Sequence, residues 1–357
     1  MSDSIPSQRA ALEITVRSEP GADWDSFVDR HPDASIYLKK GWSLLARDVF
    51  RHSAYFLEAR DGSGALQGVL PIVQQKSLLL GNFATSVPFY NYGGALAESE
   101  AVALALMDKG VKLARDRGCS YLEYRDARQR PGTWTVRTDK VSMILDLPPT
   151  FAELSKNLGS KLRSQAKRAD REEPSVKIGS TELLDSFYDV FAQNMRDLGT
   201  PVYPKKFFAA ILERFRNHTT IVLITSRGVP AAAAFLVVAN GRAEIPWASC
   251  RADMKPLGFN MKLYWEVLQH VCDLKCTSFD FGRSTINAGT YNFKKQWGAQ
   301  PVQLYWHRWE RSPRTGSQPR AEGEERGLMY YATQVWRRLP LPIANTVGPW
   351  FSPNLPW

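Results

Sequence analysis

The sequence contains few cysteines and no long apolar run. Its 357 residues include 4 cysteines, which are scattered along the chain: Cys119, Cys250, Cys272 and Cys276. Scattered cysteines without an export signal are typical of reduced thiols, and residues 1–9 are polar where a secretory signal would be apolar. No segment approaches the roughly 20 apolar residues that a membrane span requires. We therefore expect a cytoplasmic protein without a transmembrane segment, and peripheral contact of its C-terminal tail with the inner membrane stays open.

The sequence also lacks the signatures of several enzyme classes. It has neither a phosphate-binding P-loop nor a dinucleotide fingerprint, and Cys272 and Cys276 have no partner pair at zinc spacing. Ser53 is the only serine next to a histidine, and no Gly-x-Ser-x-Gly nucleophile elbow occurs. We expect no metal site, no tightly bound cofactor and no hydrolase triad.

The composition is that of a folded protein with an excess of positive charge. A hydrophobic fraction of 44% and a charged fraction of 23% are ordinary for globular proteins, and the length suggests two domains. The net charge of +10 favours polyanions, whether nucleic acid, nucleotide, lipid phosphate or a membrane surface. The same charge spread evenly over the surface would mean only solubility.

Hydrophobic periodicity predicts a mixed α/β fold in both halves of the chain. In the first half we expect strands over residues 54–59, 67–75, 120–125 and 141–147 and helices over 22–30, 39–50 and 99–117. A single basic helix is predicted from Thr150 to about Glu173. The second half is expected to contain helices over 182–198, 205–216 and 258–274 and strands over 220–225, 232–238, 243–249 and 277–282.

The two halves resemble each other in sequence. Residues 37–62 align with residues 203–228, and the identical positions are Tyr37/Tyr203, Lys39/Lys205, Lys40/Lys206, His52/His218, Leu57/Leu223 and Gly62/Gly228. The likeness continues in the strand after each long helix, where residues 119–125 resemble residues 276–283. Two tandem domains are therefore predicted, and two unrelated α/β domains are the alternative.

Composition changes set the predicted boundaries. Pro148 and Pro149 break the chain, which gives an N-terminal domain over 11–149 and a C-terminal domain over 150–310. Residues 311–326 are rich in Ser, Pro, Arg, Gly and Glu and are expected to form a flexible linker. Residues 327–357 form an amphipathic tail rich in Pro and Trp. We expect the tail to dock on the body of the protein, with a partner or a membrane as the alternatives.

The segment 279–298 carries the strongest candidate chemistry. A buried strand ends at Asp280, Gly282 and Arg283, and a short helix with Lys294 follows. Asp280 could accept a proton from an amine, while Lys294 could stabilise a developing oxyanion. Local chemistry also allows a structural ion pair between Asp280 and Arg283, with Phe293 and Trp297 packed into the core.

The same segment, Tyr291-Asn-Phe-Lys-Lys-Gln-Trp-Gly298, resembles the C-terminal signature of FemAB-like transferases. The likeness extends over residues 13–309 and is greatest to the branch associated with exosortase and PEP-CTERM systems. It implies two tandem acyl-CoA N-acyltransferase (GNAT) folds that transfer an acyl or aminoacyl group to an amine of a cell-envelope or exopolysaccharide precursor. The implied donor is acyl-CoA, acyl-carrier protein or aminoacyl-tRNA, with tRNA as a candidate partner.

The resemblance also suggests roles for individual residues. Phe293 and Lys294 match the aromatic-lysine pair of the family, the lysine steadying the donor carbonyl or the tRNA end. The other candidate substrate-binding residues are Arg283, Tyr291, Trp297, the loop residues Tyr90, Asn91 and Tyr92, the basic-helix residue Arg163, and Gly258 and Asn260 at a helix start. A surface turn at Tyr90 and a solvated charged face around Arg163 are the alternatives.

Two departures from the family pattern concern the donor. The chain has no long inserted helical hairpin, which puts a tRNA-dependent role in peptidoglycan synthesis in doubt. The acyl-CoA loop of simple N-acetyltransferases is only partly matched by residues 251–260, although Gly258 is retained. The rival function is a noncatalytic module that binds RNA or an anionic membrane on a degenerate transferase fold.

Overall fold

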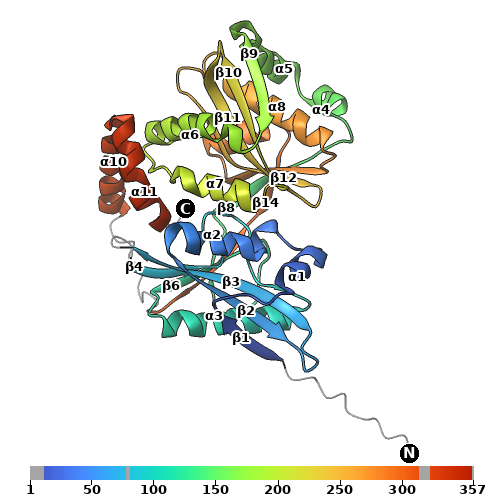
Figure 1. The fold of residues 1–357 in the computed structure, drawn as a ribbon, viewed down its shortest axis with the longest axis vertical. Coiled ribbons are helices and arrows are strands. Elements are labelled where there is room, and N and C mark those ends of the chain that lie inside the picture. Colours follow the sequence, from blue (N-terminus) through green and yellow to red (C-terminus); the bar gives the residue numbers. More distant parts are fainter. Residues whose placement is uncertain (1–11, 78–80, 313–321, 356–357) are drawn as a thin grey trace, which may run out of the picture. The chain divides into compact units, whose positions relative to one another are not determined.

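The computed structural model describes residues 12–77, 81–312 and 322–355, which form two compact units (Figure 1). Unit 1 contains the described residues up to Arg137 together with residues 305–312. Unit 2 contains Thr138–Leu304 and the C-terminal residues 322–355. Most of the predicted linker, residues 313–321, lies outside the described residues, as do residues 1–11 and 356–357.

Unit 1 is built on one mixed sheet with helices on both faces. Leu57 and Leu70 pack on one face with helix α3 (Glu100–Asp116), whereas Phe56 and Val69 pack on the other with α1 (Trp24–Arg30) and α2 (Lys40–Phe50). This alternation follows from the two-residue period of a strand. The strand order is β1 (Glu13–Arg17), β2 (Ser53–Arg60), β3 (Leu66–Ser77), β4 (Gly81–Thr85), β6 (Tyr121–Asp126), β15 (Tyr305–Glu310) and β7 (Thr135–Arg137), with β5 (Leu96–Ala97) paired to β3.

Unit 2 repeats this plan with a second sheet. Ala234 and Leu236 belong to the core that contains α8 (Phe259–Asp273), while Phe235 between them packs against Phe187 of α6 (Leu184–Leu198) and Phe208 of α7 (Lys205–Arg214). The strand order is β14 (Gln300–Gln303), β8 (Lys140–Asp146), β13 (Ser278–Thr285), β12 (Arg242–Cys250), β11 (Val229–Ala239), β10 (Thr219–Ser226) and β9 (Pro174–Gly179). The predicted mixed α/β fold with two sheets is confirmed.

The chain passes between the units at strands rather than at the predicted break. We placed the division at residues 149 and 150, whereas it falls between Arg137 and Thr138. The reason is that β8 pairs with β13 and β14 of unit 2. In turn β15, from the end of the predicted C-terminal domain, pairs with β6 and β7 of unit 1. Strand pairing across the sequence, which local composition does not encode, sets both boundaries.

The predicted basic helix is interrupted. Thr150 caps its start, since Thr150 Oγ1 accepts a hydrogen bond from the backbone N–H of Glu153 at 3.3 Å. Helix α4 (Phe151–Asn157) then ends at Leu158, whose backbone is extended and whose side chain is buried. Gly159, a poor helix former, precedes α5 (Ser160–Lys167), and a 3-10 helix over Arg168–Glu172 follows.

The tail forms two helices rather than one and docks on unit 2, as expected. Helices α10 (Glu322–Arg338) and α11 (Leu341–Phe351) both contact α6. At the end of α6, a Cβ added to Gly199 would lie 2.7 Å from the backbone oxygen of Thr333 in α10. A Cβ on Gly348 of α11 would lie 2.9 Å from the backbone nitrogen of Val202. Close packing at these glycines fixes both helices.

The glycine contact gives a test of tail docking. Gly199 and Gly228 both have left-handed backbones, with φ of 76° and 82°, but a Cβ on Gly228 would meet nothing within 4 Å. Gly228→Ala should therefore cost only the left-handed strain, about 1–2 kcal/mol. Gly199→Ala should cost at least about 1 kcal/mol more because of the overlap with Thr333. Urea unfolding of both variants measures this difference, and equal losses would contradict the docking.

Candidate active site in unit 2

Lys294 lies buried beneath the end of strand β13. It belongs to the short helix α9 (Gly289–Lys295), and its side chain is 8% exposed. Its Nζ donates hydrogen bonds to the carbonyl oxygens of Gly282 and Arg283, both at 2.9 Å. Burial lowers the pKa of the Lys294 ammonium to about 8, an effect that the charge of Asp280 opposes, Arg283 reinforces and Glu244 opposes. The ammonium is therefore desolvated and held by two fixed carbonyl groups.

An irregularity in β13 creates this pair of carbonyls. Asp280 pairs with Ile144 of β8, but the register shifts before Arg283 pairs with Ser142. Gly282 sits within the shift with φ of 77°, a conformation that favours glycine. Successive strand carbonyls normally point to opposite sides, so the bulge is what lets two neighbouring carbonyls meet one ammonium.

Asp280 fastens the bulge to the neighbouring strand. Its Oδ1 accepts a hydrogen bond from the backbone N–H of Gly282 at 2.7 Å. The Ser142 hydroxyl, fully buried on β8, donates to the same carboxylate at 2.7 Å from Oδ1 and 2.9 Å from Oδ2. From the sequence we predicted that Asp280 accepts a proton from an amine. In the structure its carboxylate holds the Gly282 bulge against β8.

Strands β12 and β13 part close to Asp280. Their parallel pairing covers Arg242 with Ser278, Ala243 with Phe279 and Glu244 with Asp280, although β12 continues to Cys250. Glu244 thus lies beside Asp280 at the point of separation, and its charge acts on Lys294. Beyond this pair of residues, β12 continues along β11 and β13 continues along β8.

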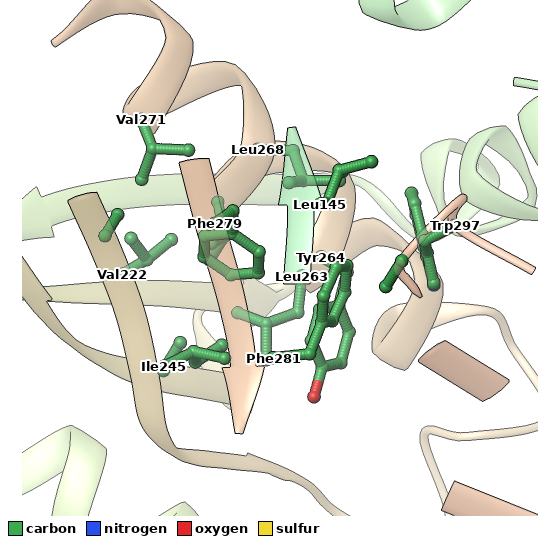
Figure 2. Packing of buried hydrophobic residues seen from close by; sticks show 14 of the residues in the cluster. Leu145, Val222, Ile245, Leu263, Tyr264, Leu268, Val271, Phe279, Phe281 and Trp297 are labelled. Atoms are coloured by element: carbon green, nitrogen blue, oxygen red, sulfur yellow. The ribbon is translucent and has the colours of Figure 1, made fainter. Parts of the chain in front are cut away.

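Aromatic residues support the site from within the core. Figure 2 shows Phe279 and Phe281 of β13 beside Tyr264 of α8, with Trp297 nearby. The ring centroids of Tyr264 lie 5.6 Å from Phe281 and 5.0 Å from Phe293. Tyr291 and Trp297 are members of the same buried cluster, and Phe293 packs against it. The structure therefore places Tyr291, Phe293 and Trp297, which we predicted to bind substrate, in the packing that holds α9.

The region at the start of α8 packs against α5 and the 3-10 helix that follows α5. Gly258 caps the helix with φ of 94°, and a Cβ there would be 3.0 Å from Cβ of Arg168. Asn260 is half-buried in the first turn. Arg163 donates from Nη1 to the carbonyl oxygens of Ser155, at 3.2 Å, and Leu158. The guanidinium of Arg163 thus caps α4, a role that the predicted continuous helix could not reveal.

The predicted loop at Tyr90 belongs to unit 1 and packs into it. The Tyr90 ring is buried and stacks on Tyr37 with centroids 4.2 Å apart. The backbone carbonyl oxygen of Tyr90 accepts a hydrogen bond from Arg125 Nη1 at 2.8 Å. Asn91 is also buried, whereas Tyr92 is half-buried. The structure brings together Asp280, Arg283 and Lys294 in unit 2, and it places these three loop residues in the other unit.

Comparison with known families identifies the domain that carries Lys294. Residues 156–295, all within unit 2, match the family model described as an acetyltransferase (GNAT) domain. Unit 2 has a GNAT-like fold over this segment. No curated protein matches the sequence.

Solved structures extend the likeness to both units. The crystal structure of FemX covers 82% of this chain and 96% of its own, with 12% identity and a TM-score of 0.60. For L-PGS from Bacillus licheniformis the coverages are 90% and 98%, the identity 13% and the TM-score 0.55. A tandem GNAT protein from the clavulanic acid biosynthesis pathway covers 85% of this chain and 99% of its own, with 11% identity and a TM-score of 0.50. These likenesses concern the fold, and they confirm the prediction of two tandem GNAT-like domains.

Two polar residues near Lys294 were not among the predicted site residues. Ser142 lies within β8, where a serine between apolar residues is a usable signal. Glu244 is the third residue of β12 and lies beside Asp280. Among the described residues, no group of His, Cys, Asp or Glu could hold a metal ion. Within the same residues, no helix has the length and apolar character needed to cross a membrane.

The charge of Asp280 should be measurable at Lys294. Because Asp280 raises the pKa of the lysine against burial, Asp280→Asn should move that pKa further below about 8. Amine-selective labelling between pH 6 and 10, read by mass spectrometry of the peptide, gives the titration midpoint. Exposed Lys295 on the same peptide is the internal reference. A midpoint that rises or stays constant in Asp280→Asn would rule out this electrostatic coupling.

Proposed function

We propose that the protein is an acyltransferase that moves an acyl or aminoacyl group from an activated donor to an amine, with Lys294 at the reacting carbonyl. One observation carries the proposal: a buried ammonium is fixed by two backbone carbonyls that use two of its three N–H groups. A fixed donor in a desolvated site stabilises charge that develops on a carbonyl oxygen in the transition state.

The reaction needs no covalent enzyme intermediate. The amine nitrogen attacks the donor carbonyl carbon, a C–N bond forms, and the C=O electron pair moves to the oxygen facing Lys294. Collapse of this oxyanion re-forms the C=O bond and expels the thiolate of a thioester or the ribose oxygen of an aminoacyl ester. The amine loses one proton, which Glu244 accepts. Asp280 positions the Gly282 bulge, since its carboxylate is already engaged by Ser142 and Gly282.

The charge near the start of α8 favours a donor that carries phosphate. Helix α5 and the turn after it pack against α8, and the basic side chains exposed there are Lys161, Lys167, Arg168 and Arg171. The N-terminus of α8 adds the partial positive charge of its first turn, where Asn260 lies. Acyl-CoA, acyl-carrier protein and aminoacyl-tRNA all carry phosphate. Acetyl-CoA is named for the similar clavulanic-pathway protein, which makes CoA thioesters the first donors to test.

The acceptor is proposed to be an amine on a cell-envelope or exopolysaccharide precursor. Support comes from the FemAB-like signature around Lys294, which resembles the exosortase and PEP-CTERM branch, and from the fold shared with FemX. In unit 1, Tyr92 is half-buried, whereas Tyr90 and Asn91 are buried within the loop.

Lys294→Met tests the proposal. Loss of one preorganised donor should lower kcat by about 10²–10³-fold and leave donor affinity nearly unchanged. Lys295→Met, which removes an exposed charge from the same helix, is the matched control and should retain activity. Thermal shift and turnover with acyl-CoA, acyl-carrier protein and aminoacyl-tRNA would identify the donor. If no donor binds, while RNA or anionic vesicles bind both variants and the parent equally, the noncatalytic alternative holds.

The pH profile separates the roles of the charged residues. Because the ammonium form of Lys294 is the active one, activity should fall as pH rises through the Lys294 pKa of about 8. Asp280→Asn should shift that alkaline limb to lower pH. Glu244→Gln should instead remove the acidic limb and lower kcat by about 10²–10⁴-fold, as loss of a general base does. An acidic limb that survives in Glu244→Gln and disappears in Asp280→Asn would return the base role to Asp280.

A further inference from the structure

The C-terminal helices expose large apolar side chains even though they are docked. On α10 and α11 these side chains are between 39% and 71% exposed: Tyr330, Tyr331, Val335, Ile343, Trp350 and Phe351. The opposite sides of the same helices are anchored on unit 2, through Thr333 against Gly199 and Gly348 against Val202. The apolar surface is therefore presented by folded helices with fixed backs. Six such side chains between Tyr330 and Phe351 exceed the scattered exposure of single residues that is normal on a protein surface.

Basic residues lie among the exposed apolar residues, whereas the acidic residues of α10, Glu322, Glu324 and Glu325, lie in its first turn. Residues 327–355 contain no Asp or Glu, and their only charged side chains are Arg337 and Arg338, both exposed at the end of α10. Helix α11 has no charged residue. The whole chain carries a net charge of +10. Tyrosine, tryptophan and arginine beside aliphatic residues fit the headgroup region of a bilayer that contains anionic lipid.

Two further features favour a lipid surface over a second copy of the chain. Self-association that places the C-terminal ends of two α10 helices together would bring Arg337 and Arg338 of both copies close to one another, because the acidic residues of α10 lie in its first turn. Helix α11 has 11 residues and is about 16 Å long, which suits a helix lying in the interface and not one crossing a hydrocarbon core of about 30 Å.

We propose that α10 and α11 are a membrane-docking element that lies on the surface of a bilayer containing anionic lipid. Tyr331, Val335, Ile343, Trp350 and Phe351 enter the boundary between headgroups and acyl chains, and Arg337 and Arg338 contact lipid phosphates. Amphipathic helices of this composition bind reversibly, with a strength set by buried apolar area and by charge. The proposal concerns a surface separate from Lys294 and does not depend on the proposed transferase activity.

Vesicle co-sedimentation of the full chain tests the proposal. Phosphatidylcholine vesicles with phosphatidylglycerol should pellet the protein, and vesicles of phosphatidylcholine alone should do so much less. Tyr331→Ser combined with Trp350→Ser should weaken binding at least about tenfold, because the apolar contribution is lost. Arg337→Gln combined with Arg338→Gln should remove most of the preference for anionic vesicles. Val229→Ser, at an exposed apolar residue on the β10–β11 turn, is the control and should bind like the parent.

Each variant changes exposed side chains only, and urea unfolding verifies that it is folded. A loss of binding can therefore be assigned to the substituted side chains. Failure of the parent to pellet with anionic vesicles would overturn the proposal. Binding that persists in the Tyr331/Trp350 variant would also overturn it and would assign the membrane contact to the basic surface of α5. A change from dimer to monomer in that variant, measured by light scattering, would show that the surface binds a second copy instead. Transferase activity on a soluble donor and acceptor should stay unchanged in all tail variants, so the two proposals fail independently.

Discussion

The hydrogen bond from the backbone of Gly282 to Asp280 is the constraint on which the site depends. It holds β13 in a bulge, and the bulge turns two consecutive carbonyls toward one buried ammonium. Ser142 secures the same carboxylate from β8. A buried lysine without such partners would be strongly destabilising, since desolvation of a charge is costly unless hydrogen bonds compensate it. The aromatic residues that pack against α9 hold this helix in place and so keep Lys294 buried.

The duplicated fold makes the two units comparable at this position. In each unit a short parallel pairing ends at an acidic residue, Glu123 opposite Thr85 in unit 1 and Asp280 opposite Glu244 in unit 2. Glu123 is bound by Arg125, at 3.3 Å, and the Arg125 guanidinium lies over the ring of Trp306. In unit 1 the acidic residue at this position is therefore paired with an arginine, whereas Asp280 of unit 2 holds a glycine bulge. Among the described residues, Lys294 of unit 2 is the buried lysine.

Sequence patterns predicted the regular elements well and the joins between them poorly. The long helices α3, α6 and α8 and the longer strands of both sheets appear close to their predicted bounds, because each shows a clear apolar period. Strands β4, β5, β7, β9, β14 and β15 were not predicted, since they are short and most of them carry polar or charged residues. The prediction of one continuous basic helix was wrong, because the chain leaves the helical conformation at the buried Leu158. The break exposes the last carbonyl groups of α4, which Arg163 caps.

The sequence by itself determined the mixed α/β class, the tandem organisation and the segment that carries Lys294, because periodicity and the signature around residue 294 are local properties. Only the tertiary structure decided what surrounds that lysine. Ser142 and Asp280 are 138 residues apart, and they meet because β8 leaves the first half of the chain to pair with β13. The exchange of β15 into unit 1 likewise moved the domain boundary. Strand partners are decided by the global fold. Neither the hydrogen bond from Ser142 to Asp280 nor the lowered pKa of Lys294 could therefore be predicted from residues near them in sequence.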